Sequence, residues 1–207
     1  MSHVPARGPE LLRSTDSVWS GFRPGARPWT YCSAAILILA TAAYIPYAIL
    51  SDEGPRGGSW PGLIYGFVAT ASILVPMLIP LRNRFPALRF GKPALWMQAH
   101  VWFGLLSYPL AIFHAGKLGW HGLLSQVLMG VFTLLLISGI VCLFLQRTLP
   151  TVTALQALSG DRRHIARQRR LRMLLDGWLL VHVPLAYLLL VLVVIHSVMA
   201  FRFTSPG

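Results

Sequence analysis

The sequence contains few charged residues, and acidic residues are the rarest of them. Of its 207 residues, 12% are charged and 55% are hydrophobic, with 6 Asp and Glu against 18 Lys and Arg. A water-soluble domain needs a charged surface, so this composition argues against one. It favours an integral membrane protein.

Cysteine is also scarce. Only Cys32 and Cys142 occur, far apart in the chain and outside any CxxC or CxxCH pattern. The sequence therefore predicts packing roles for both residues, and it offers no attachment site for a c-type haem.

Long apolar runs dominate what is present. Five of them reach the roughly 20 residues that a helix needs to cross a hydrocarbon core of about 30 Å. They predict an all-α integral membrane fold with five transmembrane helices, at residues 31–50, 62–81, 96–115, 123–145 and 178–201. These helices form one domain over residues 29–207, and residues 1–28 are predicted to be a polar basic tail.

The basic residues predict the orientation, because Lys and Arg are retained on the cytoplasmic side during insertion. Fifteen of the eighteen lie in the tail, in the connection after the second span and in the connection after the fourth. We therefore expect a cytoplasmic amino terminus and an outside carboxyl terminus, in a bacterial inner membrane. The segment 161–177, DRRHIARQRRLRMLLDG, is expected to be a charged cytoplasmic loop.

The net charge of +12 follows from this topology together with attraction to anionic membrane lipid. Nucleic acid is not an expected partner, although a basic segment can bind it in other settings.

The third and fifth predicted spans repeat one pattern, Trp-x3-His-x13-His. Trp96, His100 and His114 correspond to Trp178, His182 and His196. Fourteen positions turn a helix through about 1400°, about 40° short of four full turns, and advance it by about 21 Å. Both histidines of a pair therefore lie on one face, one near each end of the span.

The two histidine-bearing helices run in the same direction, because one helix lies between them in the chain. His100 is then expected to face His182 at one depth, and His114 to face His196 at the other. Two neutral imidazoles that face each other can hold an iron porphyrin from both sides. The sequence predicts two b-type haems, an inner one bound by His100 and His182 and an outer one bound by His114 and His196.

Other roles for intramembrane histidines remain open, chiefly packing and proton transfer. The five predicted spans contain no Asp, Glu, Lys or Arg, which argues against a proton relay or a cation site. Two histidines at each level also leave a tetrahedral metal ion short of ligands.

Haem propionates are carboxylates, which are costly to bury without a charged partner. The candidate partners for the inner haem are Arg89, Lys92, Arg170 and Arg172, and those for the outer haem are Lys117 and Arg202.

The paired His-x13-His motif resembles the ferric reductase-like transmembrane domain. Ferric reductases, NADPH oxidases and the haem membrane subunit of a bacterial methionine sulfoxide reductase system share that domain, and the resemblance covers about residues 60–201. It implies a di-haem cytochrome b that passes electrons across the membrane. Many members also have a flavin and nicotinamide domain, but no dinucleotide fingerprint occurs here, so we expect no flavin within this chain.

The sequence thus predicts an electron-transfer subunit of an oxidoreductase complex rather than a stand-alone enzyme. Its donor would be a quinol or a flavoprotein, and its outer-face acceptor a redox protein such as a c-type cytochrome; quinone is a further candidate cofactor. Two alternatives stay open. One is a quinol-oxidising cytochrome b-type subunit, although the expected Pro-Glu-Trp-Tyr motif is absent. The other is a non-redox membrane scaffold subunit whose histidines only pack.

Overall fold

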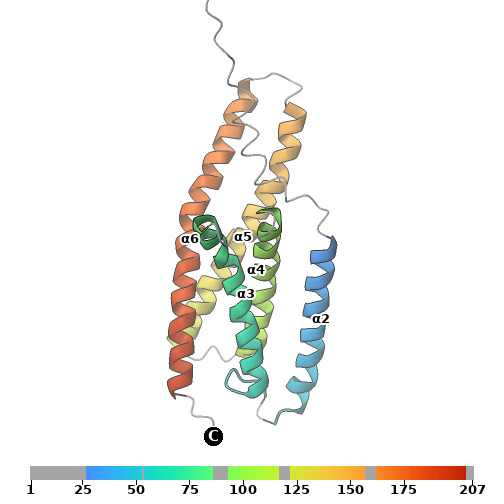
Figure 1. The fold of residues 1–207 in the computed structure, drawn as a ribbon, viewed down its shortest axis with the longest axis vertical. Helices are drawn as coiled ribbons and strands as arrows, with labels where there is room; N and C mark the ends of the chain where they lie inside the picture. The colour runs from blue at the N-terminus through green and yellow to red at the C-terminus, as the bar shows by residue number, and fades with distance from the viewer. Residues whose placement is uncertain (1–26, 53, 86–92, 117–121, 157–161, 204–207) are drawn as a thin grey trace, which may run out of the picture. The chain divides into compact units, whose positions relative to one another are not determined.

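The computed structural model describes residues 27–52, 54–85, 93–116, 122–156 and 162–203, which are helical apart from short connections. The helices are α2 (Arg27–Leu50), α3 (Trp60–Arg84), α4 (Pro93–Ala115), α5 (Leu123–Gln156) and α6 (Arg162–Phe203). The chain divides into two compact units, residues 1–118 with α2 to α4 and residues 119–207 with α5 and α6 (Figure 1). The predicted all-α class is confirmed.

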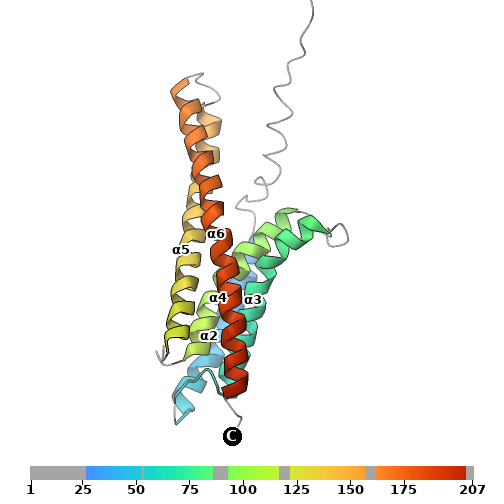
Figure 2. The same ribbon diagram turned by 90° about the vertical axis from the view of Figure 1, so that its left-hand side faces the viewer.

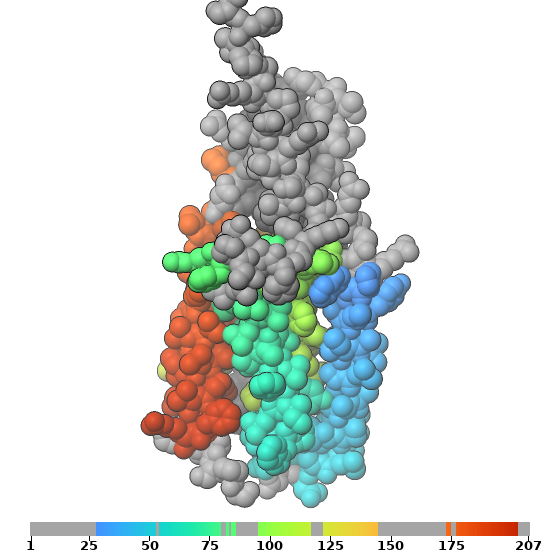
Figure 3. All heavy atoms as spheres, in the orientation of Figure 1, coloured from blue at the N-terminus to red at the C-terminus, as the bar shows by residue number. Residues whose placement is uncertain are grey.

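Four helices contain segments long and apolar enough to cross a membrane. These segments are Pro28–Leu50, Trp60–Ile79, Leu123–Phe144 and Gly177–Arg202. Their large apolar side chains remain exposed: α2, blue in Figure 3, exposes Ile38, Leu39 and Ile49 by 67%, 69% and 75%. Apolar surface on this scale is expected where lipid is the solvent. The chain is a multi-pass membrane protein.

The remaining helix, α4, coincides with the predicted third span but is not among these four. Its 23 residues include Gln98, His100 and His114, and each of these polar side chains lowers the hydropathy of the segment. The prediction of five spans is therefore confirmed for four of them. The orientation of the two chain ends stays a prediction.

In the first unit, α4 lies antiparallel to α3 and α2 packs against α4 (Figure 1, Figure 2). Ala69, Leu106 and Leu110 form the buried core of this contact. Ser107 is also fully buried, and its hydroxyl donates to the Gly104 carbonyl at 2.8 Å. Small residues such as Ala69, Gly104 and Ser107 let membrane helices approach closely, so side chains of α4 can contact the backbone of α3.

The first turn of α3 lies beside the last turn of α4, and a local sequence feature marks each of these two helix ends. Ser59 caps α3, because its hydroxyl oxygen accepts the Gly62 N–H at 3.2 Å. α4 ends at Ala115 and is followed by Gly116, whose φ of 70° lies in the left-handed region that favours glycine. The Gly116 N–H donates to the Ile112 carbonyl at 3.1 Å and completes the last turn.

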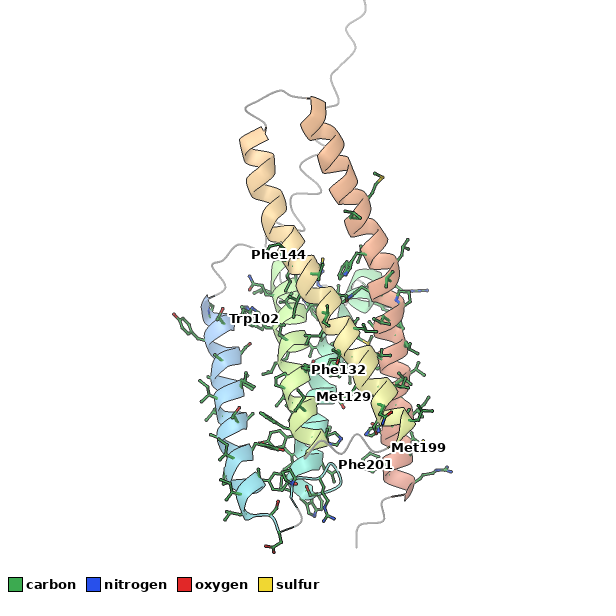
Figure 4. All side chains as sticks on the ribbon, turned by 180° about the vertical axis from the view of Figure 1, so that it is seen from behind. Trp102, Met129, Phe132, Phe144, Met199 and Phe201 are labelled. Carbon is green, nitrogen blue, oxygen red and sulfur yellow. The ribbon has the colours of Figure 1, made fainter. Side chains whose placement is uncertain are left out.

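The second unit is an antiparallel hairpin of α5 and α6. α5 buries Met129 and Phe132, both labelled in Figure 4, and α6 buries Leu189 and Val193.

Both helices of the hairpin continue beyond their apolar segments, which corrects the prediction of a charged loop at residues 161–177. Residues 162–176 belong to α6 and add about 22 Å of helix ahead of its apolar segment. This stretch contains no Gly or Pro and is rich in Arg and Leu, which favour helix. The dense positive charge led to the prediction of a loop, although most of these residues favour helix.

The predicted tail, residues 1–28, lies outside the described residues except for its last two, which begin α2. The predicted single domain over residues 29–207 stays a prediction.

Candidate functional site

α4 carries two of the four predicted ligands on one face. His100 and His114 are fourteen positions apart in one helix, which places them about 21 Å apart along its axis. Both side chains are half-buried. Each ring lies against a carbonyl of α3: His114 Nδ1 is 2.8 Å from Gly62 O, and His100 Nδ1 is 3.4 Å from Pro76 O.

The two contacts share one register. Gly62 and Pro76 are fourteen residues apart on α3, the same spacing as His100 and His114 on α4. Because the helices are antiparallel, the later histidine meets the earlier carbonyl. A single alignment of α3 with α4 therefore positions both rings.

The Pro76 carbonyl is available to His100 for a reason that is visible in the sequence. Within α3 this carbonyl would accept the N–H four residues later, but that residue is Pro80, which has none. His100 supplies a donor in its place, although at 3.4 Å the bond is weaker than the one at His114.

These contacts determine which ring nitrogen carries the proton. A carbonyl oxygen only accepts hydrogen bonds, so His100 and His114 donate from Nδ1. In the neutral imidazole the lone pair is then on Nε2. This is the tautomer that binds metals through Nε2, with the other N–H held by a neighbouring acceptor.

On α6, His182 has the same tautomer through a different acceptor. Its Nδ1 is 2.8 Å from the hydroxyl oxygen of Ser138 on α5. That hydroxyl donates its own proton to the Leu135 carbonyl at 2.7 Å. Since a hydroxyl has one proton to donate, the Ser138 oxygen accepts from His182, and the lone pair is again on Nε2.

Trp178 strengthens this arrangement. Its indole N–H donates to the Ser138 carbonyl at 3.0 Å, and its ring lies over that of His182 with centroids 4.3 Å apart and planes 30° apart. Ser138 therefore binds both the Trp and the first His of the Trp-x3-His pattern. The corresponding Trp96 contacts Arg82, whose guanidinium carbon is 5.8 Å from the ring centroid.

His196 is half-buried on α6, fourteen positions after His182. The structure thus places two predicted ligands in each unit. The pairing of His100 with His182, and of His114 with His196, stays a prediction.

The predicted propionate partners are less well described. Arg202 is exposed in the last turn of α6, and Arg170 and Arg172 belong to the helical extension of α6. Arg89, Lys92 and Lys117 lie outside the described residues. The propionate contacts stay predictions.

No group of three or more His, Cys, Asp or Glu that could hold a metal ion occurs in the part of the chain that the structure describes. Cys32 is exposed on α2, Cys142 is buried on α5, and neither is in a disulfide.

The acceptors of the histidine protons were not predicted. Gly62 and Pro76 act through backbone carbonyls, which have no sequence signature, and Ser138 resembles any small residue at a helix contact. The proline four residues after Pro76 was the one available signal.

No protein-family model, no curated protein and no solved structure matches this chain. The resemblance to the ferric reductase-like domain therefore depends on the histidine pattern alone.

Proposed function

We propose that this protein is a di-haem cytochrome b subunit that relays electrons across the membrane between a separate donor and an acceptor. One observation carries the proposal. At His100, His114 and His182, an acceptor holds the Nδ1 proton, which places the lone pair on Nε2, a nitrogen through which histidine binds metals. Histidines that bind metals almost always donate their other N–H in this way.

The donor set fits haem b. Two imidazoles would hold one haem iron, so four histidines would suffice for two haems. His100 and His182 would hold the inner haem, and His114 and His196 the outer one. Bound haem would supply a reversible one-electron Fe(III)/Fe(II) couple at each depth.

In this proposal the chain's own residues orient the ligands. Gly62, Pro76 and Ser138 hold the Nδ1 protons, and Trp178 restricts the ring of His182. These contacts would keep the Nε2 atoms in place through repeated oxidation and reduction.

We further propose that α4 crosses the membrane as a fifth span. Its histidines lower its hydropathy, but His100 and His114 bond to α3, and polar groups are tolerated at membrane depth when neighbouring helices satisfy them. With five spans and the basic connections in the cytoplasm, the amino terminus is cytoplasmic and the carboxyl terminus outside.

The proposed relay needs partners. A quinol or a flavoprotein is the proposed donor, and an outer-face redox protein such as a c-type cytochrome is the proposed acceptor. Complementary charge at the basic cytoplasmic side would raise the encounter rate with an acidic flavoprotein.

A scaffold subunit is the competing function, because the same hydrogen bonds would also satisfy histidines that only pack. The two functions differ in whether haem is bound.

The test is haem content. We expect the purified protein, produced with ample haem, to contain two b-type haems per chain, with a reduced-minus-oxidised spectrum typical of bis-histidine ligation. The matched control is the double variant His100→Ala/His114→Ala, which should bind neither haem. A colourless wild-type protein that is folded and helical would refute the cytochrome and support the scaffold.

A further inference from the structure

The imidazole of His114 lies against glycines from two segments. On α3, a methyl group in place of the Gly66 hydrogen would lie 2.6 Å from His114 Nδ1 and 2.8 Å from its Cε1. In the α2–α3 connection, a methyl group at Gly57 would lie 3.2 Å from Cε1 and 3.1 Å from the His114 carbonyl oxygen. The ring therefore occupies space that any larger residue at Gly66 would require.

The connection that carries Gly57 is fixed at several points. The Arg56 N–H donates to the Tyr47 hydroxyl of α2 at 3.0 Å, and the Ser59 hydroxyl donates to the Arg56 carbonyl at 2.7 Å. A methyl group at Gly62 would clash with that same Arg56 carbonyl. Gly57 is thus held between the end of α2 and the first turn of α3.

The end of α4 approaches the same connection. A Cβ atom at Gly116 would clash with the Pro55 carbonyl oxygen. The contact positions the last turn of α4, which contains His114, against the connection.

We propose that Gly57 and Gly66 are positioning residues for His114. They form a glycine notch, defined by these two residues, which fixes the plane of the imidazole and keeps its Nδ1 proton on the Gly62 carbonyl. The Nε2 lone pair then points in one direction, which we assign to the outer haem. This assignment rests on the proposed function, whereas the effect of the notch on the ring does not.

A graded series of substitutions tests the notch. Gly66→Ala requires the ring to move, since carbon and nitrogen atoms do not approach to 2.6 Å without a bond. Gly57→Ala requires a shift of a few tenths of an ångström. Gly58→Ala is the matched control, because a methyl group at this neighbouring position meets nothing within 4 Å.

We expect Gly66→Ala to lose one of the two haems and to retain the other with an unchanged spectrum. Gly57→Ala should retain both haems and change the electron paramagnetic resonance g-values and reduction potential of one. Gly58→Ala should match the wild type. The retained haem reports that the Gly66→Ala protein is folded. If Gly66→Ala keeps two haems with wild-type g-values and potentials, the proposal is overturned.

A second measurement does not depend on haem. Nitrogen-15 nuclear magnetic resonance of histidine in the haem-free protein distinguishes the Nδ1–H from the Nε2–H tautomer. We expect His114 to be the Nδ1–H tautomer in wild type and Gly58→Ala, and to lose that preference in Gly66→Ala. A wild-type His114 that is the Nε2–H tautomer overturns the notch, as does a preference that Gly66→Ala leaves unchanged. If the wild type binds no haem, the proposed function fails and this measurement still decides the role of the notch.

Discussion

A histidine ring can coordinate a metal reproducibly only if it cannot turn freely, and here the restraint acts at Nδ1. The acceptors are chemically different: a helix carbonyl for His114, a carbonyl beside a proline for His100, and a serine hydroxyl for His182. Their effect is the same, because each leaves the lone pair on Nε2.

The pairing of the four proposed ligands can be tested one residue at a time. We expect His100→Ala and His182→Ala each to remove the same haem, and His114→Ala and His196→Ala each to remove the other, because the repeated spacing places one ligand from each helix at each depth. Haem per chain and the electron paramagnetic resonance spectrum of the remaining haem identify which one is lost. Loss of the same haem from His100→Ala and His114→Ala would contradict the arrangement.

Ser138 provides a second test at this scale. Ser138→Ala removes the acceptor of the His182 proton, and loss of such a partner typically weakens metal binding roughly tenfold to a hundredfold. We expect this loss at one haem only, measured by titrating haem into the haem-free protein. The matched control is Ser72→Ala, whose buried hydroxyl donates to the Val68 carbonyl of its own helix at 2.8 Å. Equal affinities in the two variants would contradict a role for Ser138.

At the scale of helices, α3 does more than span the membrane, because it holds α4 through two carbonyls. The backbone at Pro76 has this capacity because Pro80 has no N–H to compete for it.

Pro80→Ala tests this role of α3. The new N–H competes with His100 for the Pro76 carbonyl, while the helix is relieved of a proline penalty of up to about 3 kcal/mol. A weaker hydrogen bond makes the His100 imidazole less basic, so it stabilises ferric iron less. The reduction potential of the haem bound by His100 should therefore rise, while that of the second haem stays unchanged. Redox titration measures both. Pro46→Ala in α2 is the control, and an identical shift in both variants would refute the mechanism.

Some helices were predictable from sequence and others only in part, for physical reasons. Lipid requires long apolar runs, so the four confirmed spans lie within a few residues of their predicted bounds. The extension of α6 over residues 162–176 was missed because dense positive charge resembles a solvated loop. The histidine pattern could be recognised because a fourteen-residue spacing is visible along the sequence, and its role as a ligand set stays a prediction. Gly62 and Ser138 were not, because helix packing selects them and no pattern along the chain marks them.

For the whole molecule, the number of spans determines on which sides of the membrane the two ends lie. Five spans place the ends on opposite sides, whereas four spans without α4 would place them on the same side.

Topology reporters can therefore decide whether α4 crosses. We expect a fluorescent protein that folds only in the cytoplasm to be bright on the amino terminus and dark on the carboxyl terminus. A periplasmic phosphatase should show the reverse, because α4 satisfies its histidines against α3 and can enter the bilayer. The same fusions placed after residue 85 and in the α2–α3 connection after residue 58 serve as controls for each side, because neither position depends on α4. Matching signals at the two termini would show that α4 does not cross.

The shared register of α3 and α4 also restricts how the length of this chain can change. One residue inserted between Gly62 and Pro76 would rotate one carbonyl by about 100° and shift it by about 1.5 Å relative to the other. The only insertion that restores both contacts is a matching one between His100 and His114. Descendants of this sequence should therefore change the two fourteen-residue intervals together or not at all.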